Sequence, residues 1–392
     1  MSQKRIILCF SLLLLCIGAL THAQAQSLKW VPPETRIGSI DASGSANESL
    51  RVSPDSKRVA YTVVAGTKQF VVVDGKEGKR YDGIGDPLFS PDSKRVAYGA
   101  RTSNKWFVVV DGKEGKQYNG ILAPGPLFSP DSKRIAYGAG TGTKRFVIVD
   151  GKEGKQYDGI TGPLGPLFSP DSKRIAYKVV AGTKQFVIVD GKEGKRYDGI
   201  LASGPLFSPD SKRVAYGVVA GTKQFVVVDG KEGKQYDGIL APGPLFSPDS
   251  KRVAYGAGTG TKQFVVVDGK EGKRYDSITG PLGPLFSPDS KRVAYTVVAG
   301  TKQFVVVDGK EGKQYDGILV PGPLFSPDSK RVAYGVVAGT KQFVVVDGKE
   351  GKQYNGIINF GGGRIVFDSA DSLHYLALKG TGIYLVQESI KR

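Results

Sequence analysis

The sequence is poor in the residues that form disulfides, thiol nucleophiles and sulfur- or nitrogen-rich metal sites. Its 392 residues include two cysteines, two histidines and one methionine. Cys9, Cys16 and His22 all lie near the N-terminus, so His374 is the one histidine in the rest of the chain. If the N-terminal segment is removed, disulfides, thiol catalysis and Cys/His metal sites are all excluded.

The first 25 residues have the pattern of a secretory signal peptide. The basic pair Lys4-Arg5 precedes the apolar stretch Ile6–Leu20, and the small-residue sequence Ala23–Ala25 follows. The apolar stretch is about 15 residues long, shorter than the roughly 20 that a membrane-spanning helix needs. A lipid anchor on Cys16 is the alternative, but the bulky leucine before it fits lipoprotein processing poorly. We therefore expect cleavage after residue 25, no transmembrane segment, and a secreted or periplasmic protein.

The most informative feature is the stretch SPDSKRVAY at Ser53–Tyr61, which returns seven more times in close copies. The first serines of these copies are spaced by 37 to 40 residues, a fixed period that indicates a repeat architecture. Each unit is rich in valine, phenylalanine and tyrosine and is broken by glycine and proline, which excludes helical repeats. The serines are Ser53, Ser90, Ser129, Ser169, Ser208, Ser247, Ser287 and Ser326.

A single unit, Pro205–Ile239, predicts four short strands joined by tight turns. The third of them is apolar on both faces, as expected of a sheet that is covered by a neighbour on each side. Four antiparallel strands in about 40 residues is the size of one propeller blade. The expected strands are Pro205–Ser208, Lys212–Val219, Lys223–Asp229 and Lys234–Ile239, with a hairpin loop at Gly230–Gly233 before the last.

The two ends of the chain predict that the repeats close into a ring. A degenerate ninth unit at 363–388 has three expected strands and no fourth: Arg364–Asp368, Leu373–Leu378 and Ile383–Val386. The segment Thr35–Asp41 lies within the N-terminal stretch 26–49 and can supply the missing strand, which leaves no open sheet edge. We expect residues 50–392 to form one all-β propeller of about nine four-stranded blades. Eight blades, or a β-solenoid, are the alternatives.

The phrase F/V-S-P-D-S-K-R-V/I-A-Y resembles the SPDG-type repeat of the TolB-like, WD-repeat-like bacterial β-propellers. The resemblance covers nearly all of Leu50–Tyr384. The usual glycine after the aspartate is serine here, and the α/β domain that precedes the propeller in TolB is absent, which argues against a Tol-system role. The resemblance implies an exported propeller that binds partners.

The acidic groups occur in symmetric sets, which argues against an enzyme because an active site needs different groups that converge on one centre. The sequence has no G-x-S-x-G motif and suggests no serine or acid as a partner of His374, which aligns with Arg331 and is expected beside an exposed turn. The lysine-flanked DGKEG loop has too few oxygens for calcium. We expect no catalysis, no metal and no cofactor. The DGKEG aspartates are Asp74, Asp111, Asp150, Asp190, Asp229, Asp268, Asp308 and Asp347.

In a four-stranded blade, the SPDSK and DGKEG turns lie on one face, and the second-to-third turns and the linkers lie on the other. The second unit departs most from its copies, because it reads ARTSNKW where the fifth reads VVAGTKQ. We expect Trp106 to be exposed beside Arg101 and Asn104, and these three residues are the candidate binding contact.

The net charge of +18 falls to +16 without Lys4 and Arg5. This charge favours a polyanionic partner or simply keeps a repetitive protein soluble, and the even spread of lysines over the repeats favours the second interpretation. The expected function is a multivalent, monomeric scaffold that binds an envelope or extracellular protein or glycan, and not nucleic acid, through its variable face. The alternatives are binding of a polyanion by the lysine-rich face, a structural component without a ligand, and a glycan-active enzyme.

Overall fold

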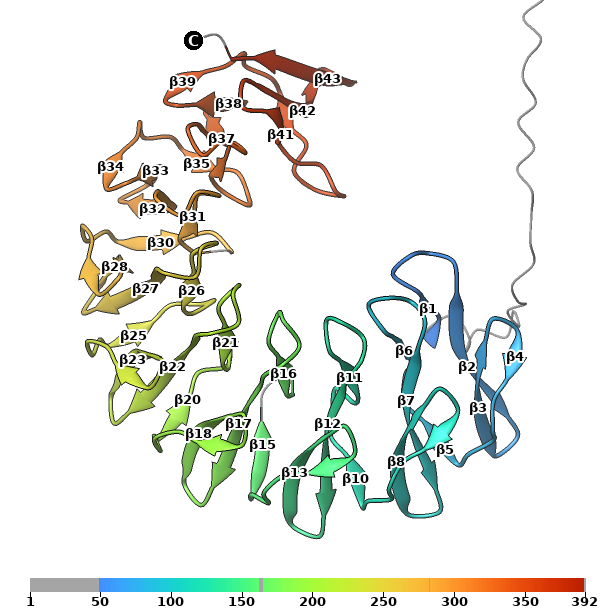
Figure 1. Ribbon diagram of the computed structural model, residues 1–392. Helices are drawn as coiled ribbons and strands as arrows, with labels where there is room; N and C mark the ends of the chain where they lie inside the picture. The colour runs from blue at the N-terminus through green and yellow to red at the C-terminus, as the bar shows by residue number, and fades with distance from the viewer. Residues whose placement is uncertain (1–48, 162–164, 282, 391–392) are drawn as a thin grey trace, which may run out of the picture. The chain divides into compact units, whose positions relative to one another are not determined.

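The computed structural model describes residues 49–161, 165–281 and 283–390, and every element named in this part of the chain is a β-strand. The strands form nine antiparallel sheets that follow one another in chain order (Figure 1). We number the sheets and their repeats from the N-terminus. The expected signal peptide at 1–25 and the expected closing strand at Thr35–Asp41 lie outside the described residues.

The fifth sheet shows the common arrangement. Its centre is the long hairpin of β22 (Val214–Ala220) and β23 (Lys223–Val228), and β24 (Lys231–Glu232) pairs with β23 on the outer side. On the inner side β22 pairs with two short strands in succession, β21 (Leu206–Phe207) and β20 (Gly199–Ile200). The inner strand is therefore split into two halves.

The same five positions recur in the second to eighth sheets. The first inner halves are β5 (Gly83–Ile84), β10 (Gly120–Ile121), β15 (Gly159–Thr161), β25 (Gly238–Ile239), β30 (Ser277–Thr279) and β35 (Gly317–Ile318). The second inner halves are β6 (Leu88–Phe89), β11 (Leu127–Phe128), β16 (Leu167–Phe168), β26 (Leu245–Phe246), β31 (Leu285–Phe286) and β36 (Leu324–Phe325). The first long strands are β7 (Val96–Thr102), β12 (Ile135–Thr141), β17 (Ile175–Ala181), β27 (Val253–Thr259), β32 (Val293–Ala299) and β37 (Val332–Ala338).

The hairpins and outer strands complete these sheets. The second long strands are β8 (Lys105–Val110), β13 (Lys144–Val149), β18 (Lys184–Val189), β28 (Lys262–Val267), β33 (Lys302–Val307) and β38 (Lys341–Val346). The outer strands are β9 (Lys113–Glu114), β14 (Lys152–Glu153), β19 (Lys192–Glu193), β29 (Lys270–Glu271), β34 (Lys310–Glu311) and β39 (Lys349–Glu350). The first sheet contains β1 (Arg51–Val52), β2 (Val59–Ala65), β3 (Lys68–Val73) and β4 (Lys76–Glu77).

The expected fourth strand, Lys234–Ile239, is wrong in detail because it is shared between two sheets. Tyr236 bridges to Gln224 in the fifth sheet, whereas Gly238–Ile239 pairs with β27 of the sixth. The expected loop at Gly230–Gly233 is also misplaced. The turn consists of Asp229 and Gly230 alone, with φ of 52° and 79°, values that suit a two-residue type I′ hairpin.

The hydrophobic core lies between neighbouring sheets. One cluster contains Ala176 and Val187 of the fourth sheet together with Phe207, Val214 and other residues of the fifth. Val226 and Val227 are neighbours in β23, yet they are 2% and 0% exposed and belong to different clusters. The sheet is therefore covered on both faces, as the continuous apolar run in its third strand predicts.

The ninth sheet contains the three strands expected in the ninth unit and one more, which lies before residue 363. It contains β40 (Gly356–Ile357), β41 (Val366–Ser369), β42 (Ser372–Lys379) and β43 (Gly382–Ser389), and β43 pairs only with β42. Ile383, Tyr384 and Leu385 on this edge strand are 66%, 49% and 61% exposed. Among the described residues no strand of the ninth sheet pairs with the first, so closure of a ring stays a prediction.

Candidate functional site

The SPDSK turn is held by its own side chains. In the fifth repeat the Ser208 hydroxyl donates to the Asp210 carboxylate at 2.6 Å and accepts the Arg213 N–H at 2.9 Å. The same carboxylate accepts the Lys212 N–H at 3.1 Å. These hydrogen bonds, that of Ser208 foremost, lower the pKa of Asp210. Asp210 therefore stabilises a turn and is not a free carboxylate that could act in catalysis.

The serine after the aspartate of the SPDSK turn connects adjacent repeats. Ser211 adopts a φ of 66°, in the left-handed region that glycine enters at no steric cost. Its hydroxyl accepts the N–H of Asp171 in the preceding repeat at 2.9 Å. The serine thus forms a hydrogen bond between repeats that glycine lacks, and this bond offsets a backbone cost of about 1–2 kcal/mol.

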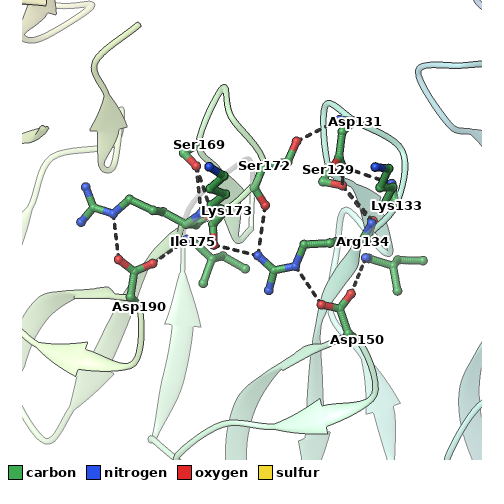
Figure 2. Close-up of polar contacts among 12 residues, drawn as sticks. Ser129, Asp131, Lys133, Arg134, Asp150, Ser169, Ser172, Lys173, Ile175 and Asp190 are labelled. Atoms are coloured by element: carbon green, nitrogen blue, oxygen red, sulfur yellow. Dashed lines mark hydrogen bonds and ion pairs between the residues drawn. The ribbon is translucent and has the colours of Figure 1, made fainter. Parts of the chain in front are cut away.

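The arginine of the signature connects adjacent repeats (Figure 2). Arg134 Nε donates to the Asp150 carboxylate of its own repeat at 2.8 Å. Its Nη1 donates to the carbonyls of Ser172 and Lys173 in the next repeat at 3.1 and 2.9 Å. The guanidinium also lies 5.2 Å from the ring centroid of Phe168 in the next repeat. One arginine thus joins two turns of its own sheet to the following sheet.

Two further polar links join the sheets. Glu232 of the fifth sheet accepts from the Lys195 ammonium at 2.7 Å and the Tyr197 hydroxyl at 2.9 Å, both in the outer strand region of the fourth. The hydrogen bond from Lys195 is the main cause of the lowered pKa of Glu232. At the opposite ends of the strands Asp198 accepts from Lys184 at 2.6 Å and from the Gly221 N–H at 2.7 Å.

Some lysines remain outside these links. Lys270 of the sixth repeat and Lys291 of the seventh form no ion pair within 4 Å among the described residues. Both line a cleft of about 420 Å³ between the sixth and seventh sheets. Val267 and the Tyr295 side chain form part of its wall, and burial raises the pKa of Tyr295 to about 12, so that its hydroxyl stays protonated.

The cleft recurs between other sheets. The fifth and sixth sheets enclose one of about 420 Å³ that is lined by Lys231, Lys251 and Tyr255, and the seventh and eighth enclose one of about 380 Å³. Between the eighth and ninth sheets the cleft is lined instead by Lys349, Glu350 and Glu388. Sequence reasoning missed these clefts, although the excess of lysine and arginine together over acid in each repeat was the signal for them.

The predicted contact of Trp106, Arg101 and Asn104 is brought together in the second sheet. Arg101 and Trp106 face each other across the β7–β8 hairpin, with the guanidinium 5.7 Å from the ring centroid, and Asn104 is exposed in the turn. Trp106 was expected to be exposed, but it is half-buried. The inference from its position was wrong because Gln224 at the same position is also half-buried, and its side chain accepts the Ile239 N–H at 2.9 Å.

His374 has an acidic partner that the sequence did not suggest. Its Nδ1 lies 2.7 Å from Asp368 Oδ1 in the ninth sheet. The expected alignment with Arg331 is also wrong. His374 pairs with Val366 in the β41–β42 ladder, and the residue at the same position of the eighth sheet is Ala333, which pairs with Leu324. No hydroxyl of the described residues contacts the second ring nitrogen, so the pair lacks the nucleophile of a triad.

Lys178 is the one lysine in the described part of the chain that is buried, at 8% exposure. Its ammonium donates to the Ile200 carbonyl of the fifth sheet at 3.3 Å, and burial lowers its pKa. Four of the other copies have glycine here against a linker leucine, for example Gly217 against Leu201. The described residues contain no cluster that could hold a metal ion and no helix long and apolar enough to span a membrane.

No protein-family model and no curated protein matches the chain. Similar solved structures include the β-propeller domain of the Trilobed protease from Pyrococcus furiosus, at 15% identity and a TM-score of 0.32, with 74% of this chain and 96% of that chain covered. The Dos1 propeller is 12% identical, with a TM-score of 0.35 and coverages of 78% and 93%. TolB from Acinetobacter baumannii is 17% identical, with a TM-score of 0.28 and coverages of 73% and 84%. These neighbours are β-propeller proteins, and the all-β repeat architecture itself rests on the strand pairings above.

Proposed function

We propose that this protein is an exported, non-catalytic β-propeller that acts as a multivalent binding scaffold for an extracellular or envelope partner. The observation that carries the proposal is the recurrence of one cleft between successive sheets. Equivalent sites on one chain add their contacts, and linked sites gain about 10²–10⁴ in avidity when their geometry permits simultaneous contact. The repeated polar groups are engaged in links between sheets, which leaves no converging catalytic set among them.

The proposal includes a ring of nine blades that is closed by the N-terminal segment. The exposed edge of β43 supports it, because Ile383, Tyr384 and Leu385 form an open apolar sheet edge of the kind that proteins normally cover. We propose that the segment Thr35–Asp41 supplies a further strand of the ninth sheet beside β43. The signal at 1–25 would deliver the mature chain to the periplasm or the medium, where we propose that it acts as a monomer.

The test uses the mature chain, residues 26–392, on an array of cell-envelope glycans and surface proteins at about 50 and 300 mM salt. These conditions correspond to Debye lengths of roughly 14 and 6 Å. Saturable binding at either salt concentration supports the scaffold. Failure of saturable binding at both contradicts it and favours a structural component without a ligand, whereas turnover of an array glycan would indicate an enzyme.

The variable face is a second candidate for the contact. The Arg101–Trp106 stack next to the exposed Asn104 favours it, because aromatic and arginine side chains dominate the energy of many interfaces. The variant Trp106→Gln restores the residue found in six other copies and serves as the matched test. Binding that persists at 300 mM salt and weakens in this variant places the contact on the variable face.

A further inference from the structure

We infer that the clefts between sheets bind the carboxylate-bearing sugars of an acidic polysaccharide, an inference that rests on the proposed scaffold function. The first step is the charge that remains after internal pairing. In the sixth repeat Arg252 pairs with Asp268, and Glu271 with Lys234 of the preceding repeat, each at 2.8 Å or less. Lys251 and Lys270 have no such pair among the described residues, and they supply the excess positive charge of the repeat.

The unpaired lysines of adjacent repeats lie at the same cleft. Lys270 of the sixth repeat and Lys291 of the seventh meet at one cleft, although they are 21 residues apart in the sequence. Lys231 and Lys251 meet in the same way at the preceding cleft. An anionic group in such a cleft is approached by an ammonium group from each of two sheets, so the arrangement favours a ligand that is bound between repeats.

The wall of the cleft indicates the kind of anion that it binds. The cleft wall includes Val267 and Val293, which offer an apolar surface, and the Tyr295 side chain. The Tyr295 hydroxyl forms no hydrogen bond with any described residue, and it lies 3.5 Å from the position that a Cβ on Gly272 would occupy. An apolar wall, a free hydroxyl donor and two ammonium groups suit a sugar ring that carries hydroxyls and a carboxylate. The volume of about 420 Å³ is within the range of small-ligand pockets.

The arginines argue against a phosphate polymer. Arginine is the side chain whose planar fork matches phosphate best, and in each cleft it is already bound to an aspartate. Arg252 Nε donates to Asp268, and its Nη1 donates to the carbonyls of Ser290 and Lys291. The cations without an ion pair in these clefts are lysines, and an ammonium group is a point charge that cannot bind a phosphate in the bidentate way that arginine does.

The cleft recurs between successive sheets, and its lining changes at the ninth sheet. The lysine pair lines two successive clefts, between the fifth and sixth and between the sixth and seventh sheets, so a linear polymer with regularly spaced carboxylates can occupy both at once. The cleft against the ninth sheet has the glutamate that also lines the other clefts, here Glu350, and a second one, Glu388. Asp371 pairs with Arg331 at 2.9 Å. This last cleft presents acid in place of the second lysine, and we expect it to bind no carboxylate.

The experiment compares two variants with the same change in charge. The cleft variant carries Lys231→Gln, Lys251→Gln, Lys270→Gln and Lys291→Gln. The control carries Lys184→Gln, Lys223→Gln, Lys262→Gln and Lys302→Gln, four lysines that pair with aspartates at 2.5–2.6 Å at the other ends of the strands. Binding of polygalacturonate to the mature chain is measured at about 50 mM salt, after circular dichroism has shown that both variants are folded.

The cleft variant is expected to lose at least tenfold in affinity for polygalacturonate and the control less than threefold, while the methyl-esterified polymer does not bind. An equal loss in both variants overturns the inference, because it would show that only the net charge matters. Polyphosphate that binds as tightly as polygalacturonate overturns the assignment to a carboxylated sugar. If polygalacturonate fails to bind while another envelope ligand binds saturably, the inference falls and the scaffold function stands.

Discussion

Replacement of Arg213 by alanine is expected to lower the free energy of unfolding by about 2–3 kcal/mol, because a charged donor is removed from acceptors in two sheets. Arg213 donates to the Asp229 carboxylate at 2.8 Å and to the Ser250 and Lys251 carbonyls of the next repeat at 3.1 and 2.8 Å. Its guanidinium also lies 5.3 Å from the ring centroid of Phe246. The side chain is 30% exposed, so solvent lessens the loss and keeps it below that of a fully buried pair.

The measurement is urea unfolding of the mature chain. Lys212→Ala is the matched control, because its ammonium makes no hydrogen bond or ion pair with any described residue, and a surface change of this kind shifts stability by less than about 0.5 kcal/mol. A loss in Arg213→Ala no larger than in this control would contradict the assigned role of the arginine. In Arg213→Ala we also expect the protection of backbone amides from hydrogen exchange to fall more in the fifth and sixth repeats than elsewhere.

Acid is expected to destabilise the protein strongly below about pH 4. The hydrogen bonds of the SPDSK turns lower the pKa of one aspartate in each of the eight repeats, Asp210 among them, and the lysine and tyrosine contacts lower the pKa of glutamates such as Glu232. A carboxyl whose folded pKa lies below its unfolded value stabilises the fold above the unfolded pKa, about 4 here. It loses that contribution as the pH falls through the folded pKa.

The check is the urea midpoint at pH 7, 5 and 3. The midpoint should be nearly constant from pH 7 to 5 and fall steeply by pH 3, because equivalent carboxylates titrate together in every repeat. Ser208→Ala removes the largest contribution to the lowered pKa of Asp210 and should reduce the difference between pH 7 and pH 3. Equal midpoints at pH 7 and 3 would show that these carboxylates do not stabilise the fold.

The repeated strands could be predicted from sequence because their pattern is local. The long hairpin Val214–Val228 and the three strands of the ninth unit follow from apolar runs bounded by turn residues. The end of the fourth strand could not be placed, because Gly238–Ile239 pairs with a strand from the next repeat. Its partner is decided by contacts between sheets that no local pattern records.

The candidate site was less predictable, for the same reason. Trp106 was expected to be exposed because Gln224 and Arg145 occupy the same position in other repeats, yet the Gln224 oxygen accepts a backbone N–H of the linker into the next sheet. The clefts were missed because Lys270 and Lys291 come together only when two repeats pack. Composition showed that basic residues exceed acidic ones, and only the ion pairs of the folded chain showed that Lys270 and Lys291 are among the unpaired lysines.

The repeated polar residues join each sheet to the next, and a double-mutant cycle between Tyr197 and Glu232 measures the strength of this coupling. The two side chains belong to the fourth and fifth sheets, and the hydroxyl donates to the carboxylate at 2.9 Å. Urea unfolding of Tyr197→Phe, Glu232→Gln and the double variant is predicted to give a coupling free energy of about 1 kcal/mol. Additive effects, with a coupling below about 0.3 kcal/mol, would show that this hydrogen bond does not couple the two sheets.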